Sequence, residues 1–120
     1  MSDSETIPAG GVVISLSGHR PPDQVRFSKA ELQQILTVYG RMVARGEWRD
    51  YAMEFTRDAA VFAVFRRTSE IPLYRIFKTP KAAVRQGAYS VHAGAGYILR
   101  RGHDLARVLM VLEKPGRPAV

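Results

Sequence analysis

The run from Ala60 to Phe65, AVFAVF, constrains the fold of this chain more than any other stretch. All of its residues are apolar or aromatic, so an extended strand built from them carries apolar side chains on both faces. Such a strand belongs in the interior of a sheet. Arg66 and Arg67 end the run, and a short connection ending at Pro72 leads to a second apolar and basic run, which predicts a neighbouring strand.

A first helix is predicted from Ser28 to Gly46. Ser28 is a good N-cap and Glu31 stands three residues further on, which is the pattern of a capping box. Apolar side chains then recur at helical spacing, at Leu32, Ile35, Leu36, Tyr39 and Val43. Gly40 lies inside the helix, where it indicates either a close approach of the backbone to the sheet or a tolerated defect.

The remaining elements complete an α+β domain. Further strands are predicted at residues 50–56, 73–78, 88–93 and 97–101, a basic connection with room for a helical turn at 80–87, and a second helix from Asp104 to just before Pro115. Because strands and helices do not alternate, we expect an antiparallel meander of about five strands. The N-terminal and C-terminal amphipathic helices are expected to pack on one face of this sheet, leaving the arginines on the other. The domain is predicted to span residues 25–114, between flexible tails at 1–24 and 115–120.

Composition narrows the class of protein. The 120 residues fit one domain that can bury its own core. Cysteine is absent, which excludes disulfides, thiol nucleophiles and cysteine metal sites and suits a reducing cytoplasm. The acidic, polar start does not resemble a signal peptide, and no apolar run approaches the ~20 residues that span a bilayer. We therefore expect a cytoplasmic protein with no membrane partner.

Positive charge is concentrated in one segment. Between Ala60 and Arg107 there are nine basic and two acidic residues, so this segment holds the whole net charge of +7. A cationic surface of this kind favours a polyanionic partner, such as nucleic acid, an acidic protein or a phosphorylated ligand. The alternative is a merely solvated sheet face in an arginine-rich protein, since arginine outnumbers lysine 14 to 4.

The candidate nucleic-acid site consists of cations interleaved with aromatic residues. Cations neutralise phosphates and aromatic rings stack on bases in single-strand binding domains. The predicted site residues are Arg66, Arg67, Arg75, Lys78, Lys81, Arg100, Arg101, Tyr74 and Tyr89. The alternative is that the aromatic residues belong to the core, because strand aromatics usually do.

No pattern of a catalytic or metal site is present. His92, His103 and Asp104 match no familiar metal spacing, and Ser90 with His103 and Asp104 forms no recognisable hydrolytic arrangement. The glycines of the segment 94–96 lack the lysine and the following helix of a phosphate loop. We therefore predict a non-enzymatic protein with no catalytic residue, metal or cofactor. A small enzyme or a binder of a phosphorylated ligand is a further alternative, and it would require a pocket lined by His92, His103 and Asp104.

Several longer runs carry a resemblance to a known family. These runs are Tyr39 to Val43, Gly46 to Tyr51, Phe65 to Arg67, Pro72 to Arg75, Gln86 to Tyr89 and Arg101 to Leu105. Over about Val25 to Lys114, the chain resembles a small alphaproteobacterial family described as a domain of unknown function, DUF2794. The resemblance implies a stand-alone cytoplasmic bacterial domain and carries over no activity, cofactor or site residue. It favours a lineage-restricted binding or regulatory protein.

A second functional interpretation is a protein-interaction module that docks an acidic partner. Trp48 and Arg49 are its candidate contact residues, because tryptophan and arginine are enriched at interface hot spots. Equally, Trp48 could cover the end of the core while Arg49 and Asp50 form local ion pairs. The sequence thus predicts a small basic binding module, with nucleic acid as the first candidate partner and an acidic protein as the second, and it does not predict the oligomeric state.

Overall fold

The computed structural model describes residues 23–67 and 71–113. Its elements, in chain order, are α1 (Lys29–Ala44), β1 (Asp50–Phe55), β2 (Ala60–Phe65), β3 (Tyr74–Lys78), the short 3-10 helix η1 (Pro80–Ala82), β4 (Tyr89–Ala93), β5 (Ile98–Gly102) and α2 (Leu105–Glu113). The predicted α+β class is confirmed. The predicted flexible tails lie outside the described residues, apart from Asp23 and Gln24.

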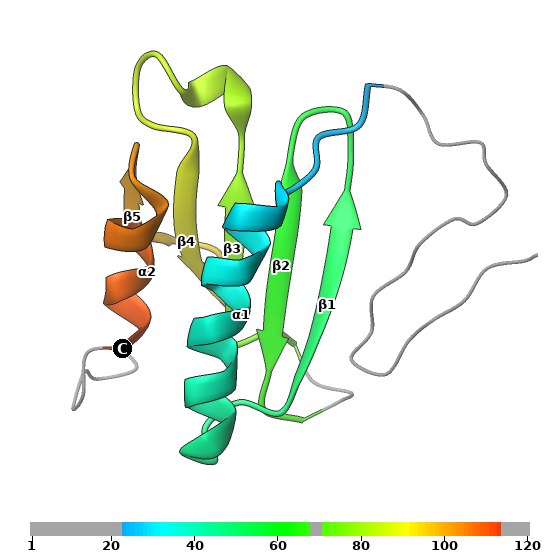
Figure 1. The fold of residues 1–120 in the computed structure, drawn as a ribbon, viewed down its shortest axis with the longest axis vertical. Coiled ribbons are helices and arrows are strands. Elements are labelled where there is room, and N and C mark those ends of the chain that lie inside the picture. The colour runs from blue at the N-terminus through cyan, green and yellow to red at the C-terminus, as the bar shows by residue number, and fades with distance from the viewer. Residues whose placement is uncertain (1–22, 68–70, 114–120) are drawn as a thin grey trace, which may run out of the picture.

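The five strands form one antiparallel sheet in the order β1-β2-β3-β4-β5. The predicted meander is therefore confirmed. Strand β2 pairs with β1 on one side and β3 on the other, and its residues from Ala60 to Val64 are buried at both parities, as an interior strand requires. Both helices lie against the same face of the sheet, with α1 over its middle and α2 over β4 and β5 (Figure 1).

The start of α1 is a capping box, as predicted. The Ser28 hydroxyl accepts a hydrogen bond from the Glu31 backbone N–H at 3.1 Å, and a Glu31 carboxylate oxygen accepts one from the Ser28 N–H at 2.6 Å. Two backbone donors that the first turn would leave without partners are thereby satisfied.

The predicted apolar stripe of α1 is confirmed for Leu32, Ile35 and Tyr39, which belong to or pack against the core, and is wrong for Leu36 and Val43. The buried residues are Ile35, Val38 and Met42, whereas Leu36 and Val43 are exposed. The helix packs against α2 as well as the sheet, so its buried stripe is rotated toward α2. Of the two interpretations of Gly40, the close approach to the sheet is absent, because a methyl group added there would meet nothing within 4 Å. Gly40 is the tolerated defect.

The core fills the space between the sheet and the two helices. Its sheet side includes four cross-strand neighbours that share one face, namely Met53, Phe62, Ile76 and Val91. Its helix side comes from the buried stripes of α1 and α2. Neither described helix is long and apolar enough to cross a bilayer.

The turn after β4 explains why the segment 94–96 is rich in glycine. A side chain at Gly94 would place its Cβ 2.0 Å from the carbonyl oxygen of Pro72, and Gly96 has a φ of 112°. The Gly94 N–H also donates to the Leu73 carbonyl at 2.8 Å. Close backbone packing and left-handed geometry therefore account for both glycines.

Candidate functional site

The sheet has one covered face and one face that no described helix covers. We call the second the open face. Because paired residues of neighbouring antiparallel strands share a face, the register defines two adjacent rows across it. One row contains Ala52, Ala63, Arg75 and His92, and the other contains Glu54, Val61, Phe77, Ser90 and Arg101. The acidic residue lies on edge strand β1, and the cations lie on β3 and β5.

His92 is at the centre of a polar and aromatic cluster on the open face. Its ring packs on that of Phe77, with centroids 4.1 Å apart and planes tilted by 33°. Its Nε2 atom is 3.0 Å from the Ser90 hydroxyl oxygen, within hydrogen-bonding distance. Arg75 is paired directly opposite His92 on the neighbouring strand β3, and Arg101 is paired opposite Ser90 on the other neighbour, β5. We call these five residues the His92 cluster.

The cluster holds His92 in its neutral form. Partial burial lowers the pKa of the imidazole first, and the positive charges of Arg101 and Arg75 lower it further. A hydrogen bond with the backbone of Gly96 opposes this shift without cancelling it. The ring is therefore uncharged near neutral pH, between two guanidinium groups.

The contact between Ser90 and His92 differs from the arrangement considered in the sequence, which joined Ser90 to His103 and Asp104. Ser90 is only 2% exposed, covered by its row neighbours on β3 and β5. The contact with Nε2 therefore lies in a buried position, where it orients the imidazole. Among the described residues, no group of three histidine, aspartate or glutamate side chains is placed to hold a metal ion.

The structure separates the predicted nucleic-acid residues into several groups. Arg75 and Arg101 lie on the open face, and Arg66 and Arg67 follow β2 directly, at the end of the sheet where β3 begins. Arg100 pairs with Val91 beside a bulge on the edge strand, and Val91 belongs to the covered face. At the opposite end of the sheet, Lys81 forms an exposed ion pair with Asp58 at 3.3 Å.

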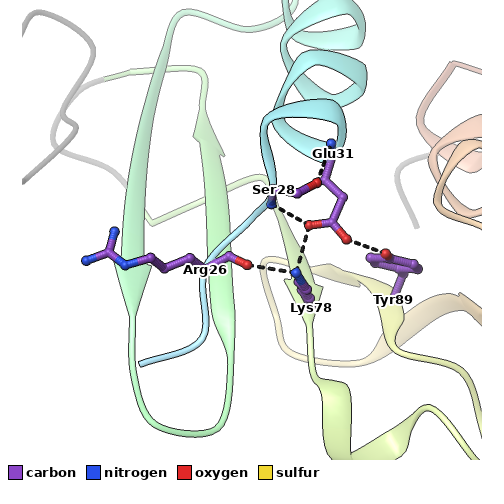
Figure 2. A network of polar contacts seen from close by, with 5 residues as sticks. All are labelled: Arg26, Ser28, Glu31, Lys78 and Tyr89. Carbon is purple, nitrogen blue, oxygen red and sulfur yellow. Dashed lines mark hydrogen bonds and ion pairs between the residues drawn. The ribbon is translucent and has the colours of Figure 1, made fainter. Parts of the chain in front are cut away.

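Lys78, Tyr74 and Tyr89 lie on the covered face. The ring of Tyr74 packs near Trp48, with centroids 6.3 Å apart. The Lys78 ammonium donates to Glu31 and to the backbone carbonyl of Arg26, each at 2.8 Å (Figure 2). These side chains make their contacts with other residues of the domain on the covered face. The structure therefore does not bring them together with the arginines of the open face.

The Glu31 carboxylate joins α1 to two strands (Figure 2). Besides the capping box, it accepts hydrogen bonds from the Lys78 ammonium of β3 and the Tyr89 hydroxyl of β4. Burial alone would raise the pKa of Glu31, but the hydrogen bonds from Lys78, Tyr89 and Ser28 outweigh it, so that the pKa is lowered. Burial and the bond to Glu31 raise the pKa of Tyr89 to about 12.

Trp48 and Arg49, the candidate interaction residues, have different environments. Trp48 is 4% exposed and belongs to the core, so its ring is not available to a partner. Arg49 is exposed, but its backbone is fixed because the N–H donates to Phe65 at 2.7 Å and the carbonyl accepts from the Tyr39 hydroxyl at 2.9 Å. The structure therefore supports the interpretation that Trp48 covers the core.

Several arginines have no acidic partner among the described residues. Within residues 23–67 and 71–113, no carboxylate oxygen lies within 4.0 Å of the guanidinium groups of Arg66, Arg75, Arg100 or Arg101. By contrast, Arg41, Arg57 and Arg107 all form ion pairs. Cations on the open face, at the adjoining sheet end and at the β5 edge are therefore available to an outside anion. Exposed cations elsewhere, such as Arg45 and Arg85, also form no ion pair within the described residues.

A groove of about 270 Å³ lies between the helices, away from this surface. It is lined by Val38, Leu109 and Met110 among others, and the ion pair between Arg41 and Glu113 lies along it. None of the predicted site residues contributes to it.

The sequence analysis missed two members of the His92 cluster as binding residues. His92 was weighed only as a metal ligand, and Phe77 was not selected for stacking. A signal for Phe77 was present, because residues two apart on a strand share a face, so it accompanies Arg75 while Tyr74 points the other way.

Comparison with known families agrees with the described domain. The family model of a protein of unknown function, DUF2794, matches residues 25–109. The chain belongs to this family. The DUF2794 match includes α1 and the whole sheet and ends inside α2, so the His92 cluster lies entirely within the family domain. No curated protein and no solved structure matches the chain.

Proposed function

We propose that this DUF2794 protein is a non-enzymatic module that binds single-stranded nucleic acid on its open face. The observation that carries the proposal is the His92 cluster, in which two packed aromatic rings lie on the same face as Arg75 of β3 and Arg101 of β5, two arginines that have no acidic partner in the described chain. Aromatic rings on an open sheet are a common platform for unpaired bases, and nearby arginines neutralise the phosphates.

The arrangement of charge favours a strand that crosses β3 to β5. Arg75 and Arg101 lie on two strands separated by β4, so their backbones are about 10 Å apart across the sheet. Long side chains can bring both cations to one backbone phosphate over this distance. Asp50 and Glu54 lie on the same face of β1, where their charge disfavours a polyanion. Arg66, at the end of β2, extends the cationic surface along the sheet end.

A single strand fits this surface better than a duplex. Phe77 and His92 are partly buried and lie among small apolar neighbours, Val61 and Ala63 on β2. Such a shallow ring surface can stack on an exposed base, whereas a duplex presents its phosphates and groove edges and hides the faces of its bases. The proposal keeps the cytoplasmic location and the alphaproteobacterial origin expected from the sequence.

The test is a fluorescence-anisotropy titration of nuclease-treated protein with a labelled single strand, over a series of salt concentrations. The variant combines Arg75→Gln with Arg101→Gln, and the matched control combines Arg57→Gln with Arg107→Gln. Both doubles remove two positive charges, but the control cations lie off the open face and already pair with acidic residues.

If the proposal holds, the open-face double should weaken binding at least tenfold and lower the log–log salt slope by roughly 0.7, since both arginines act on one phosphate and each lost phosphate contact on a single strand contributes about 0.7. The control should retain nearly the wild-type slope. Equal losses in the two doubles would show that only net charge matters. Absence of binding at low salt would refute the proposal and redirect the search to an acidic protein that docks on the same arginines.

Stacking is tested separately with Phe77→Leu. Leucine retains an apolar side chain but removes the ring that packs on His92, so binding should fall about tenfold with the salt slope unchanged. An unchanged affinity would exclude Phe77 from the contact surface.

A further inference from the structure

His92 is not part of the hydrophobic core, and it forms no ion pair with a described carboxylate. Its ring is partly buried on the open face, and the charged groups near it are the two arginines of β3 and β5. Strand β2 contributes only apolar side chains to that face, and the acidic residues of β1 lie beyond it. A site with this charge pattern attracts anions at any pH, and more strongly when the imidazole is protonated.

The hydrogen bonds of His92 are compatible with both protonation states. The Ser90 hydroxyl can donate to a neutral ring nitrogen or accept from a protonated one, because a hydroxyl is both donor and acceptor. The bond with the Gly96 backbone favours the protonated ring. Protonation therefore requires only a rotation of the buried hydroxyl, and the imidazole stays in place on Phe77.

We propose that Arg75, His92 and Arg101 form a subsite for one backbone phosphate of the bound strand, to which His92 contributes a third positive charge in mildly acidic solution. This inference rests on the proposed function. His92 acts through its charge, since Ser90 and Gly96 already occupy its ring nitrogens. The two arginines supply the hydrogen bonds to the phosphate oxygens.

Binding and protonation of His92 are then coupled. In the free protein, burial and the two arginines keep the pKa of His92 below its ordinary value. A phosphate between the arginines offsets their charge, so the pKa of the ring rises and the complex takes up a proton. Affinity should increase as the pH falls, by at most tenfold per pH unit, because a single group is linked.

The experiment measures the affinity for a thymidine oligonucleotide of roughly eight nucleotides between about pH 5.5 and 8 at constant ionic strength. Thymine is chosen because it does not titrate in this range. His92→Gln removes the titrating ring but keeps a side chain that can hydrogen-bond to Ser90. His103→Gln is the matched control, because His103 is exposed just before α2 and lies outside the cluster.

Wild type and His103→Gln should bind more tightly as the pH falls, while His92→Gln should show a flat profile that meets the wild type at the alkaline end. In wild-type protein, the NMR titration of the His92 ring should move to higher pH when the oligonucleotide is added. This second measurement needs no variant and so stands even if His92→Gln fails to fold.

The outcomes separate the two proposals. Parallel pH profiles for wild type and His92→Gln, or a His92 titration that the oligonucleotide does not shift, would overturn the phosphate subsite while leaving nucleic-acid binding intact. Absence of binding by wild type at every pH would instead refute the proposed function, and the subsite with it.

Discussion

Replacing Glu31 with glutamine removes the negative charge that faces Lys78 while disturbing little else. Glutamine is also accepted at the third position of a capping box, so the start of α1 retains its pattern. The amide oxygen takes the place of Oε1, which accepts from the Ser28 N–H and the Lys78 ammonium, and the amide NH2 can donate to the Tyr89 hydroxyl oxygen in place of Oε2. The substitution therefore isolates the ion pair, whose side chains are only 14% and 20% exposed for Glu31 and Lys78 respectively.

The expected loss lies between two limits. Removing one partner from a fully buried ion pair costs about 3 to 5 kcal/mol, because the remaining charge is left without compensation. An exposed pair contributes about 0 to 1 kcal/mol. With both side chains mostly buried, Glu31→Gln should lower the free energy of unfolding by about 2 kcal/mol, which corresponds to a Tm lower by roughly 10 °C in a domain of this size.

Chemical and thermal unfolding followed by circular dichroism provide the assay, with Arg41→Gln as the control. Arg41 pairs with Glu113, but these side chains are 54% and 28% exposed, so its loss should cost less than about 1 kcal/mol. Equal losses in the two variants would refute the argument that burial makes the Glu31 pair stronger.

Acid provides a second check. The pKa of Glu31 is lowered in the folded state, so its contribution is present above the carboxyl's unfolded pKa of about 4.3 and is lost as the pH falls through the folded value. The difference in stability between wild type and Glu31→Gln should therefore narrow in acid. A difference that stayed constant there would show that its origin is not the charge.

Three further variants test other features in the same unfolding assays. Gly40→Ala should stabilise the protein by up to about 1 kcal/mol, because a methyl group at this position in α1 meets nothing within 4 Å; a loss of stability would contradict the open space there. Gly94→Ala should cost about 3 kcal/mol or more, because its Cβ would lie 2.0 Å from the Pro72 oxygen; a wild-type Tm would refute that packing. Tyr89→Phe should remove phenolate absorbance that develops near pH 12, and since the folded pKa exceeds the unfolded one of about 10, the stability from this hydroxyl is lost as the pH rises through 12. Unchanged absorbance would place the late-titrating tyrosine elsewhere.

Local patterns were sufficient for the elements of this fold. Ala60 to Phe65 is apolar at both parities, which allows only an interior strand, and Ser28 with Glu31 sets the start of α1 through contacts three residues apart. The orientation of α1 was not predictable in the same way. Leu36 and Ile35 are equally apolar, and only the position of α2 decides which of them is buried.

The residues of the candidate site could not all be predicted, because their positions depend on contacts between residues far apart in the sequence. Glu31 reads as a capping residue, but its partners Lys78 and Tyr89 are 47 and 58 residues away. Because Lys78 and Tyr89 are hydrogen-bonded to Glu31 on the covered face, neither is part of the surface that carries Arg75 and Arg101. Trp48 is similar, since a tryptophan in a charged loop fits a core or an interface equally well until the packing is known. Phe77 was within reach of prediction, because strand parity already groups it with Arg75.

The order of the strands also has a consequence for the speed and sequence of folding. Each strand pairs with its neighbour in the chain, so every closing loop of the sheet is short and entropically inexpensive. Docking of α1, by contrast, requires β3 and β4 to be in place, because its first turn is bonded to both. The hairpins are thus expected to form the folding nucleus and the first turn of α1 to dock afterwards. In stopped-flow experiments, Glu31→Gln should then accelerate unfolding and leave the refolding rate almost unchanged.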